Sequence, residues 1–397
     1  MPELLSLEEA QRRILERTRP LPSERVAIGA AAGRVAAEEA RARVDLPPFD
    51  SSAMDGFAVR SVDTPGRLPV VERVAAGRPA SRPLGAGEAM GIATGAAVPF
   101  GADAVIPVEY VVEHDNAIEI SELVERGASI RPAGGDLGAG DVVVRSGVVL
   151  GPAQLGALAA AGVADIASAR RPRAAVLATG SELRRPGEEL APGQIYEANG
   201  VILAAQLESA GAQVRRLETV PDDEGAHRRA LTVGLEADVL VTSAGVSVGP
   251  HDLVRSVGAE LGVEEVFWGV AVKPGKPVWF GVRGETLVFG LPGNPVSSLV
   301  TFELFVRPAI RALQGDATPL PRFEPGLLSG PLRRNPARTE LVRARSSITD
   351  GAVALEPLTG QESHMIARAA GADALVLVPA GEEPLAAGDA VSYLRLA

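Results

Sequence analysis

Between residues 173 and 313, short apolar runs alternate with helical patterns, and this alternation limits the possible fold more than any other feature of the sequence. The spacing predicts strands at 174–178, 213–220 and 238–242, and helices at 199–210 and 296–313. Alternating strands and helices form right-handed βαβ units. We therefore expect a three-layer domain with a central parallel sheet.

Each strand of this region runs into a polar turn that is rich in Gly or Pro. In chain order the turns read TGSE, PDDE, TSAGVSVG, KPGK and LPGNP. Ligands of parallel sheets lie beyond the carboxyl ends of the strands, where all five turns should meet. A glycine-rich turn that leads into a helix also offers free backbone N–H groups to a phosphate. Ordinary turn chemistry explains any one turn equally well, but five on one rim predict a binding site.

The KPGK turn is unusual because it holds both lysines of the chain. All the other basic side chains, 37 of the 39, are arginines. A lysine ammonium is a compact point charge that suits a small tetrahedral oxyanion or a phosphate, whereas the arginine fork suits bidentate pairs. Chance is the alternative, but two lysines three positions apart, Lys273 and Lys276, favour an anion site.

Composition narrows the classes of partner and the location. The 397 residues carry a formal net charge of −11, which disfavours nucleic acid. No stretch reaches eighteen uninterrupted apolar residues, so no membrane span is expected. The amino terminus lacks the basic and apolar regions of a secretory signal, which predicts a cytoplasmic protein. With no cysteine, disulfides and thiolate metal sites are excluded.

The remaining segments predict smaller units on either side of the α/β domain. Ser6 and Glu9 form a capping box before an amphipathic helix at 6–18, and Pro152 begins a helix that ends before Gly162. Residues 70–149 and the chain beyond 340 read as short strands between Gly/Pro turns, which is typical of small β domains.

Three polar turns of the N-terminal half could face a cleft. The segment 45–59 combines two prolines with several side-chain oxygens, Asp55 among them, although a capped turn before a strand is an ordinary alternative. Thr94 lies in the turn 92–96, and Arg131 and Asp136 lie in the turn 131–136.

Taken together, seven motifs in one order resemble the molybdopterin molybdenumtransferase family, which includes MoeA and the gephyrin E domain. They are DLPPFDSSAMDGFAV, TGAAVPFGADAVI, ATGSEL with PGQIYEANG, TSAGVSVGPHD, KPGKPVWFG, GLPGNPVSS and GQESH. The resemblance implies a homodimer of four-domain subunits that inserts molybdate into adenylylated molybdopterin and releases AMP in the presence of Mg²⁺. Two positions depart from the family pattern: Ala244 replaces a usual glycine, and Gly269 replaces a lysine found in some members.

The resemblance and the residue patterns together divide the chain into three regions. Residues 1–170 form an N-terminal helical and β region, in which 1–45 and 140–170 make a dimerisation or linker part and 46–139 an inserted β domain. Residues 171–316 form the molybdopterin-binding α/β domain. Residues 317–397 form a small C-terminal β-barrel.

The resemblance also implies roles for individual residues. The acidic and hydroxyl side chains expected in catalysis are Asp55, Thr94, Asp136, Glu182, Asp222 and Asp252. The residues expected to bind molybdate or the pterin phosphate are Lys273, Lys276, Pro277, Pro292, Asn294, Pro295, Ser297, Arg343, Ser363, Gly245, Ser247 and Arg131. Carboxylates repel an anionic substrate unless a divalent cation lies between them, so Glu182, Asp222 and Asp252 are the expected Mg²⁺ ligands.

Three alternatives stay open from the sequence. An adenylyltransferase would use a similar α/β domain with ATP instead of molybdate. A dimeric scaffold of the gephyrin E-domain kind would not need the KPGK turn or the acidic residues. Tungstate insertion differs only in the metal, because tungstate and molybdate have nearly the same size and charge.

Overall fold

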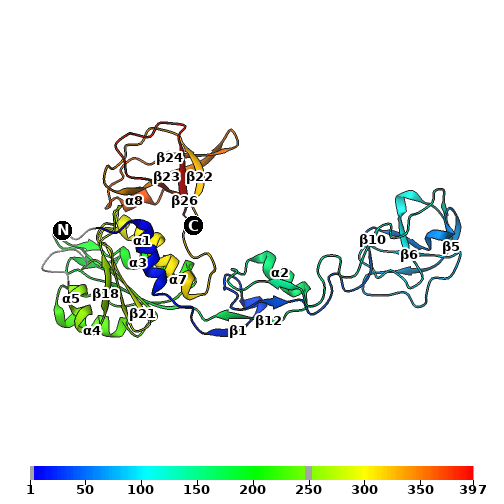
Figure 1. The fold of residues 1–397 in the computed structure, drawn as a ribbon, viewed down its shortest axis with the longest axis horizontal. Coiled ribbons are helices and arrows are strands. Elements are labelled where there is room, and N and C mark those ends of the chain that lie inside the picture. The colour runs from blue at the N-terminus through cyan, green and yellow to red at the C-terminus, as the bar shows by residue number, and fades with distance from the viewer. Residues whose placement is uncertain (1–3, 246–252, 397) are drawn as a thin grey trace.

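The computed structural model describes residues 4–245 and 253–396. The molecule is elongated: the α/β domain and the C-terminal barrel lie at one end, and a small β domain that carries β5, β6 and β10 lies at the other (Figure 1). Between these ends lie β1, β12 and α2 (Figure 1). No helix of the described residues is long and apolar enough to cross a membrane; the cytoplasmic location stays a prediction.

The α/β domain contains a six-stranded sheet in the order β16-β13-β17-β21-β20-β18. Its strands are β13 (Arg173–Ala178), β16 (Gln213–Arg216), β17 (Val239–Ser243), β18 (Glu264–Trp268), β20 (Trp279–Arg283) and β21 (Thr286–Leu291). The first four in spatial order are parallel, as predicted. However, β20 runs antiparallel to both of its neighbours, so the sheet is mixed. Because β18 therefore runs in the direction of β21, the KPGK turn after it still opens on the predicted rim.

Helices cover both faces of this sheet and give the three layers expected. Alternate residues of a strand point to opposite faces. Val176 and Val241 pack in one core with α3 (Asn199–Ser209), whereas Leu177 and Leu240 pack in the other with α4 (Glu224–Gly234) and α5 (Leu253–Glu260).

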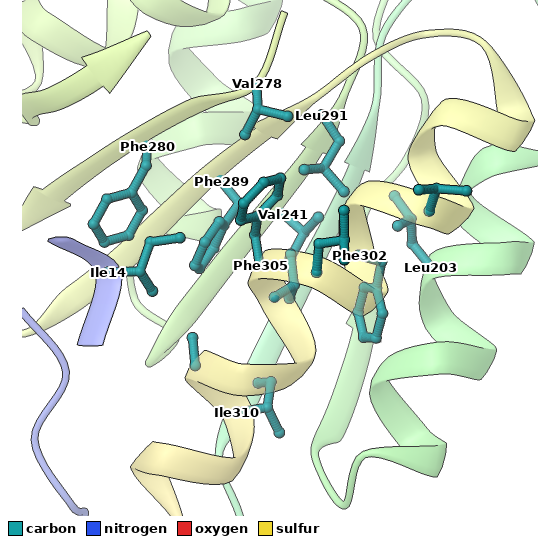
Figure 2. Close-up of a cluster of buried hydrophobic side chains, with 14 of the residues drawn as sticks. Ile14, Leu203, Val241, Val278, Phe280, Phe289, Leu291, Phe302, Phe305 and Ile310 are labelled. Carbon is teal, nitrogen blue, oxygen red and sulfur yellow. The ribbon is translucent and has the colours of Figure 1, made fainter. Parts of the chain in front are cut away.

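The N-terminal helix α1 (Leu7–Glu16) belongs to the α/β core. Half of the predicted capping box forms: the Ser6 hydroxyl accepts a hydrogen bond from the Glu9 N–H at 3.1 Å. The Glu9 carboxylate is bonded to Arg12 and Arg13. Ile14 packs with Phe280 and Phe289 of the sheet and with residues of the last helix of the domain (Figure 2). The apolar stripe of α1 is therefore buried against the mixed sheet, whereas the assignment of residues 1–45 to a linker or dimerisation part stays a prediction.

The helix predicted at 296–313 forms, but it contains an irregular turn. It consists of α6 (Pro295–Thr301), the π-helical segment η4 (Phe302–Val306) and α7 (Arg307–Leu313). Pro308 has no N–H to donate to the carbonyl of Leu304 four residues earlier. Gln11 of α1 donates its side-chain N–H to that carbonyl at 3.0 Å and so replaces the lost hydrogen bond.

The C-terminal region forms the small β-barrel that was predicted. Its strands are β22 (Glu324–Leu328), β23 (Thr339–Thr349), β24 (Ala352–Pro357), β25 (Ala374–Val378) and β26 (Ala390–Arg395), and the short helix α8 (Ile366–Ala369) lies before β25. Pairing of β22 with both β24 and β26 closes the barrel. The two-residue strand β19 (Val272–Lys273) of the α/β domain pairs in parallel with the start of β23 and fixes the barrel beside the KPGK turn.

The N-terminal half is built from short strands, as predicted. The connecting part contains β1 (Ser23–Ala27), β2 (Ala40–Arg41), β11 (Val142–Val144), α2 (Pro152–Ala160) and β12 (Asp165–Ala169), with β1 paired to β12 and β2 to β11. The β domain has the strand order β7-β4-β6-β5-β9-β8. Its strands are β4 (Gly56–Val59), β5 (Gly66–Val74), β6 (Ala89–Ile92), β7 (Ala104–Pro107), β8 (Val112–His114) and β9 (Ala117–Ile120). Beside them, β3 (Ser51–Ser52) pairs with β10 (Ile130–Arg131).

Candidate functional site

The polar turns of the α/β domain surround a pocket of about 490 Å³, which we call the rim pocket. Its wall comes from the ends of β13, β17 and β21 and from the starts of α3 and α6. The lining residues are Ala178, Thr179, Glu182, Leu183, Ile195, Tyr196, Glu197, Ala198, Asn199, Ser243, Ala244, Gly293, Asn294, Pro295 and Ile366. The TGSE, TSAG and LPGNP turns therefore meet as predicted, and Ile366 of the barrel adds a wall that the sequence did not predict.

The TGSE and PDDE turns are held together at the edge of this pocket. The Ser181 N–H donates to a carboxylate oxygen of Asp222 at 3.3 Å, and the Asp222 N–H donates to the Ser181 hydroxyl at 3.0 Å. Asp222 and Glu182 are both exposed. The two turns therefore place two predicted catalytic carboxylates on neighbouring loops, one of them in the wall of the pocket.

Asn199 joins two other turns, and the sequence reading did not single it out. Its side-chain N–H group donates to the Ser243 hydroxyl and to the Gly293 carbonyl, both at 2.6 Å. Asn199 therefore links the ends of β17 and β21 across the pocket. Its position at the end of PGQIYEANG, a polar stretch immediately before a predicted helix, could have identified it as a site residue.

Ala244 has an unusual backbone conformation in this pocket. Its φ of 73° lies in the left-handed region, which glycine adopts much more readily than alanine. A Cβ added to Gly293 would lie 3.2 Å from the Ala244 methyl group, so the two turns cross in close contact. Gly245 follows with a φ of 73°. The predicted site residues Ser247 and Asp252 lie outside the described residues.

The KPGK turn lies at a second pocket, of about 360 Å³, between the α/β domain and the barrel; we call it the interdomain pocket. Lys273 lines it and forms an ion pair with Glu340 of β23 at 2.6 Å. Lys276 is half-buried and has no ion pair among the described residues; Pro277 follows it. The sequence placed all predicted substrate groups in one site, whereas neither lysine lines the rim pocket.

The LPGNP turn connects the α/β domain to the GQESH segment of the barrel. Asn294 donates its side-chain N–H to the Ser363 hydroxyl at 2.9 Å, and the backbone N–H of Val296 donates to the Ser363 carbonyl at 3.1 Å. The structure thus brings together Asn294 and Ser363 as predicted. Of the other predicted residues here, Pro295 lines the rim pocket, and Pro292 and Ser297 are buried at the base of the turn.

Arg343 is buried and its guanidinium is bonded to protein groups, so its predicted binding of the anion stays a prediction. Only 2% of the residue is exposed. Its guanidinium donates to the carbonyls of Gly360, Glu362 and Met365 and to the side-chain oxygen of Gln361. Burial lowers the pKa of Arg343, partly offset by the charge of Glu362. These hydrogen bonds fix the loop that carries Ser363.

The predicted site residues of the N-terminal half lie in the distant β domain. Asp55 and Thr94 do come together: the backbone N–H and the hydroxyl of Thr94 donate to one Asp55 oxygen at 2.7 and 2.9 Å, and these bonds lower the pKa of Asp55. Arg131 ends β10, and both it and Asp136 are exposed. This domain lies at the opposite end of the molecule from β18 and β21 (Figure 1). One chain therefore does not bring Asp55, Thr94, Arg131 or Asp136 to the rim pocket.

Two carboxylates near the rim, Glu182 and Asp222, have the chemistry of ligands that share a magnesium ion with a phosphate. The described residues contain no group of three or more acidic or histidine side chains that could hold a metal alone. Mg²⁺ is usually held by one or two carboxylates together with substrate phosphates and water. Glu182 and Asp222 supply such a pair.

Comparison with known proteins decides the family. Three family models match in order: the MoeA N-terminal region (domains I and II) at residues 5–162, the probable molybdopterin-binding domain at 175–312, and the MoeA C-terminal region (domain IV) at 325–396. The chain belongs to the MoeA family. This confirms the resemblance seen in the sequence and makes the chain a transferase of molybdenum cofactor biosynthesis.

Curated MoeA relatives match over almost their whole length. Molybdopterin molybdenumtransferase 2 of Mycobacterium tuberculosis is 37% identical, with 96% of this chain and 97% of the relative covered. Molybdopterin molybdenumtransferase of Haemophilus influenzae is 35% identical, with 98% of each covered. A MoeA crystal structure from Pyrococcus horikoshii has a TM-score of 0.80 at 33% identity and covers 99% of each chain.

Proposed function

We propose that this MoeA-family chain inserts molybdate into adenylylated molybdopterin, with release of AMP. The observation that carries the proposal is the pair of pockets at one end of the molecule. The rim pocket offers carboxylates and amides beside strand ends, and the interdomain pocket offers lysine and arginine side chains. The first suits the metal-bound phosphoanhydride and pterin of the substrate, and the second suits a small oxyanion.

Within the rim pocket, the residues of the chain orient the substrate and supply metal ligands. Asn199 and Asn294 hold the turns against one another and fix the shape of the wall. Glu182 and Asp222 would hold Mg²⁺, which when bound neutralises charge on the phosphoanhydride that is cleaved. No covalent protein nucleophile is required, because the oxyanion is itself the second reactant.

We further propose that the active chain is a homodimer whose sites are completed by the partner. Asp55 and Thr94, both expected in catalysis from the family resemblance, form a hydrogen-bonded pair at the end of the molecule opposite the pockets. A two-fold arrangement of two elongated chains would bring this end of one subunit to the pockets of the other.

The experiment is AMP release from adenylylated molybdopterin by the purified full chain, measured with and without molybdate. We expect release to require both molybdate and Mg²⁺. Release that needs neither, or an enzyme that consumes ATP instead, would reject insertion in favour of adenylylation. Dimerisation without any turnover would favour the scaffold alternative. Substituting tungstate in the same assay compares the two metals.

A further inference from the structure

We propose that Arg333 is an oxyanion-binding residue of the interdomain pocket and that, with Lys273, it receives the tetrahedral anion before transfer. The inference rests on the proposed function and names a residue that neither the motifs nor the comparisons assign. The pocket is lined by residues of the KPGK turn, of the barrel segment 331–336 and of β23.

The charge of this pocket is opposite to that of the whole chain. Its charged lining residues are Lys273, Arg333, Arg334 and Glu340, three positive and one negative, in a protein of net charge −11. Glu340 is already paired with Lys273. A concave surface with excess positive charge concentrates small anions against the field of the whole protein.

Of the two described arginines that line this pocket, Arg333 is the one whose guanidinium is free to bind an anion together with Lys273. Arg334 donates to the carbonyls of Pro379 and Ala380 at 3.0 and 2.6 Å, so its guanidinium stabilises the loop after β25. Arg343, the expected anion ligand, is buried under its own loop. Arg333 is exposed and, among the described residues, forms no ion pair.

The backbone on both sides of Arg333 is fixed, which an anion-binding side chain requires. Leu332 exchanges two backbone hydrogen bonds with Leu385, at 2.9 and 2.8 Å. On the other side, the Asn335 side-chain oxygen accepts from the N–H groups of Ala337 and Arg338 at 3.0 and 2.9 Å. An arginine on a fixed backbone loses less conformational freedom when it binds an anion than one on a mobile loop.

One short barrel segment, residues 361–366, contributes to both the interdomain pocket and the rim pocket. Gln361 lines the first and Ile366 lines the second, and the loop between them carries Ser363, which bonds to Asn294. An oxyanion held by Arg333 and Lys273 would therefore lie beside the segment that borders the pterin site. This position suits capture of the anion before it reaches the reacting sulfur atoms.

The test is equilibrium binding of molybdate to the full chain, together with AMP release as a function of molybdate concentration. We expect Arg333→Gln to weaken molybdate binding about tenfold, as for loss of one charge-assisted hydrogen bond. The KM for molybdate should rise, whereas the KM for adenylylated molybdopterin should not change. Arg333→Lys should restore part of the affinity.

The matched control is Arg322→Gln, an exposed barrel arginine that does not line the pocket. If Arg333→Gln and Arg322→Gln bind molybdate equally well, Arg333 has no such role, although the proposed function stands. If the unaltered chain releases AMP without any dependence on molybdate, the proposed function itself fails. Thermal melting of each variant excludes an effect of misfolding, because a stable Arg333→Gln or Arg333→Lys protein suffices for the comparison.

Discussion

Substitution of Lys276 tests most directly whether the KPGK turn binds an anion. It is half-buried, and within the described part of the chain it has no acidic partner. We predict that Lys276→Arg raises the KM for molybdate roughly tenfold although the charge is kept, because a planar fork cannot replace a compact ammonium in a tight turn. AMP release at varied molybdate concentrations measures this. If the KM for molybdate is the same in this variant, the turn does not bind the anion through Lys276.

The neighbouring residues Asp222 and Asp223 allow a catalytic role to be compared with a structural one. Asp222 is exposed, and its carboxylate accepts one long hydrogen bond, so Asp222→Ala should lower Mg²⁺-dependent AMP release and leave the melting temperature nearly unchanged. Asp223 caps α4 by accepting from the Ala226 N–H at 2.7 Å. Asp223→Ala should instead destabilise the protein by about 1 kcal/mol. Magnesium titrations and thermal melts of both variants test the assignment; equal behaviour would contradict it.

Residue type alone was a good guide to some of these positions and a poor guide to others. Asn294 and Ser363 come together as their motifs suggested, because each lies in a turn whose backbone is fixed by Gly, Pro or strand pairing. The burial of Arg343 could not be predicted, because backbone carbonyls can satisfy a guanidinium as well as an anion can, and the sequence does not distinguish them.

At the scale of elements, the sequence predicted the parallel strands and the helices, but it did not predict that β20 runs antiparallel to its neighbours. Strands β20 and β21 are both nearly continuous apolar runs joined by a short turn, and such runs are compatible with either direction. Nor could the amphipathic pattern of α1 indicate which core it covers. The division of the site into two pockets depends on how the barrel docks, and the contacts that fix this, the two-residue pairing of β19 with β23 and the bonds of Ser363 to the LPGNP turn, carry no clear signal in the sequence.

The contact between α1 and the π-helical turn offers a test of element packing. Gln11 is the donor that satisfies the Leu304 carbonyl left free by Pro308. We predict that Gln11→Met lowers the free energy of unfolding by about 1–2 kcal/mol, since the carbonyl is left buried without a partner. Urea denaturation compares it with Glu8→Gln, an exposed change on the same helix. No difference between the two variants would mean that water replaces the side chain.

A partly buried carboxylate, that of Asp238, joins the linker segment to the sheet and makes stability depend on pH. Burial alone would raise the pKa of Asp238, but hydrogen bonds from Arg170 and from Arg173 lower it to about 2 from an ordinary 3.8. A depressed carboxyl pKa adds stability above pH 3.8, and this stability is lost as the pH falls toward 2.

Asp238→Asn should therefore cost about 2 kcal/mol at pH 7 and roughly half as much at pH 3. Denaturant unfolding at both pH values measures the cost, with the exposed Asp115→Asn as control. A cost that is the same at both pH values would show that the charge of Asp238 is not its source.

At the scale of the whole molecule, the elongated shape bears on how a site can be complete. The pockets of the α/β domain and barrel lie at one end, and the Asp55–Thr94 pair lies in the β domain at the other (Figure 1). If one chain worked alone, the β domain would have to fold back across the connecting strands. The pairings of β1 with β12 and of β2 with β11 tie that connection together at two places and oppose such folding.

The last prediction uses this geometry. We expect Asp55→Ala and Lys276→Ala to be inactive as separate homodimers, because each lacks one half of every site. Mixed dimers should carry one intact site, formed by the Lys276 end of one subunit and the Asp55 end of the other, so about half of the activity per mixed dimer should return. Native mass spectrometry gives the fraction of mixed dimers, and AMP release gives their activity. Mixed dimers that form but stay inactive would mean that each site is built within one chain, and the elongated form would then have to close before catalysis.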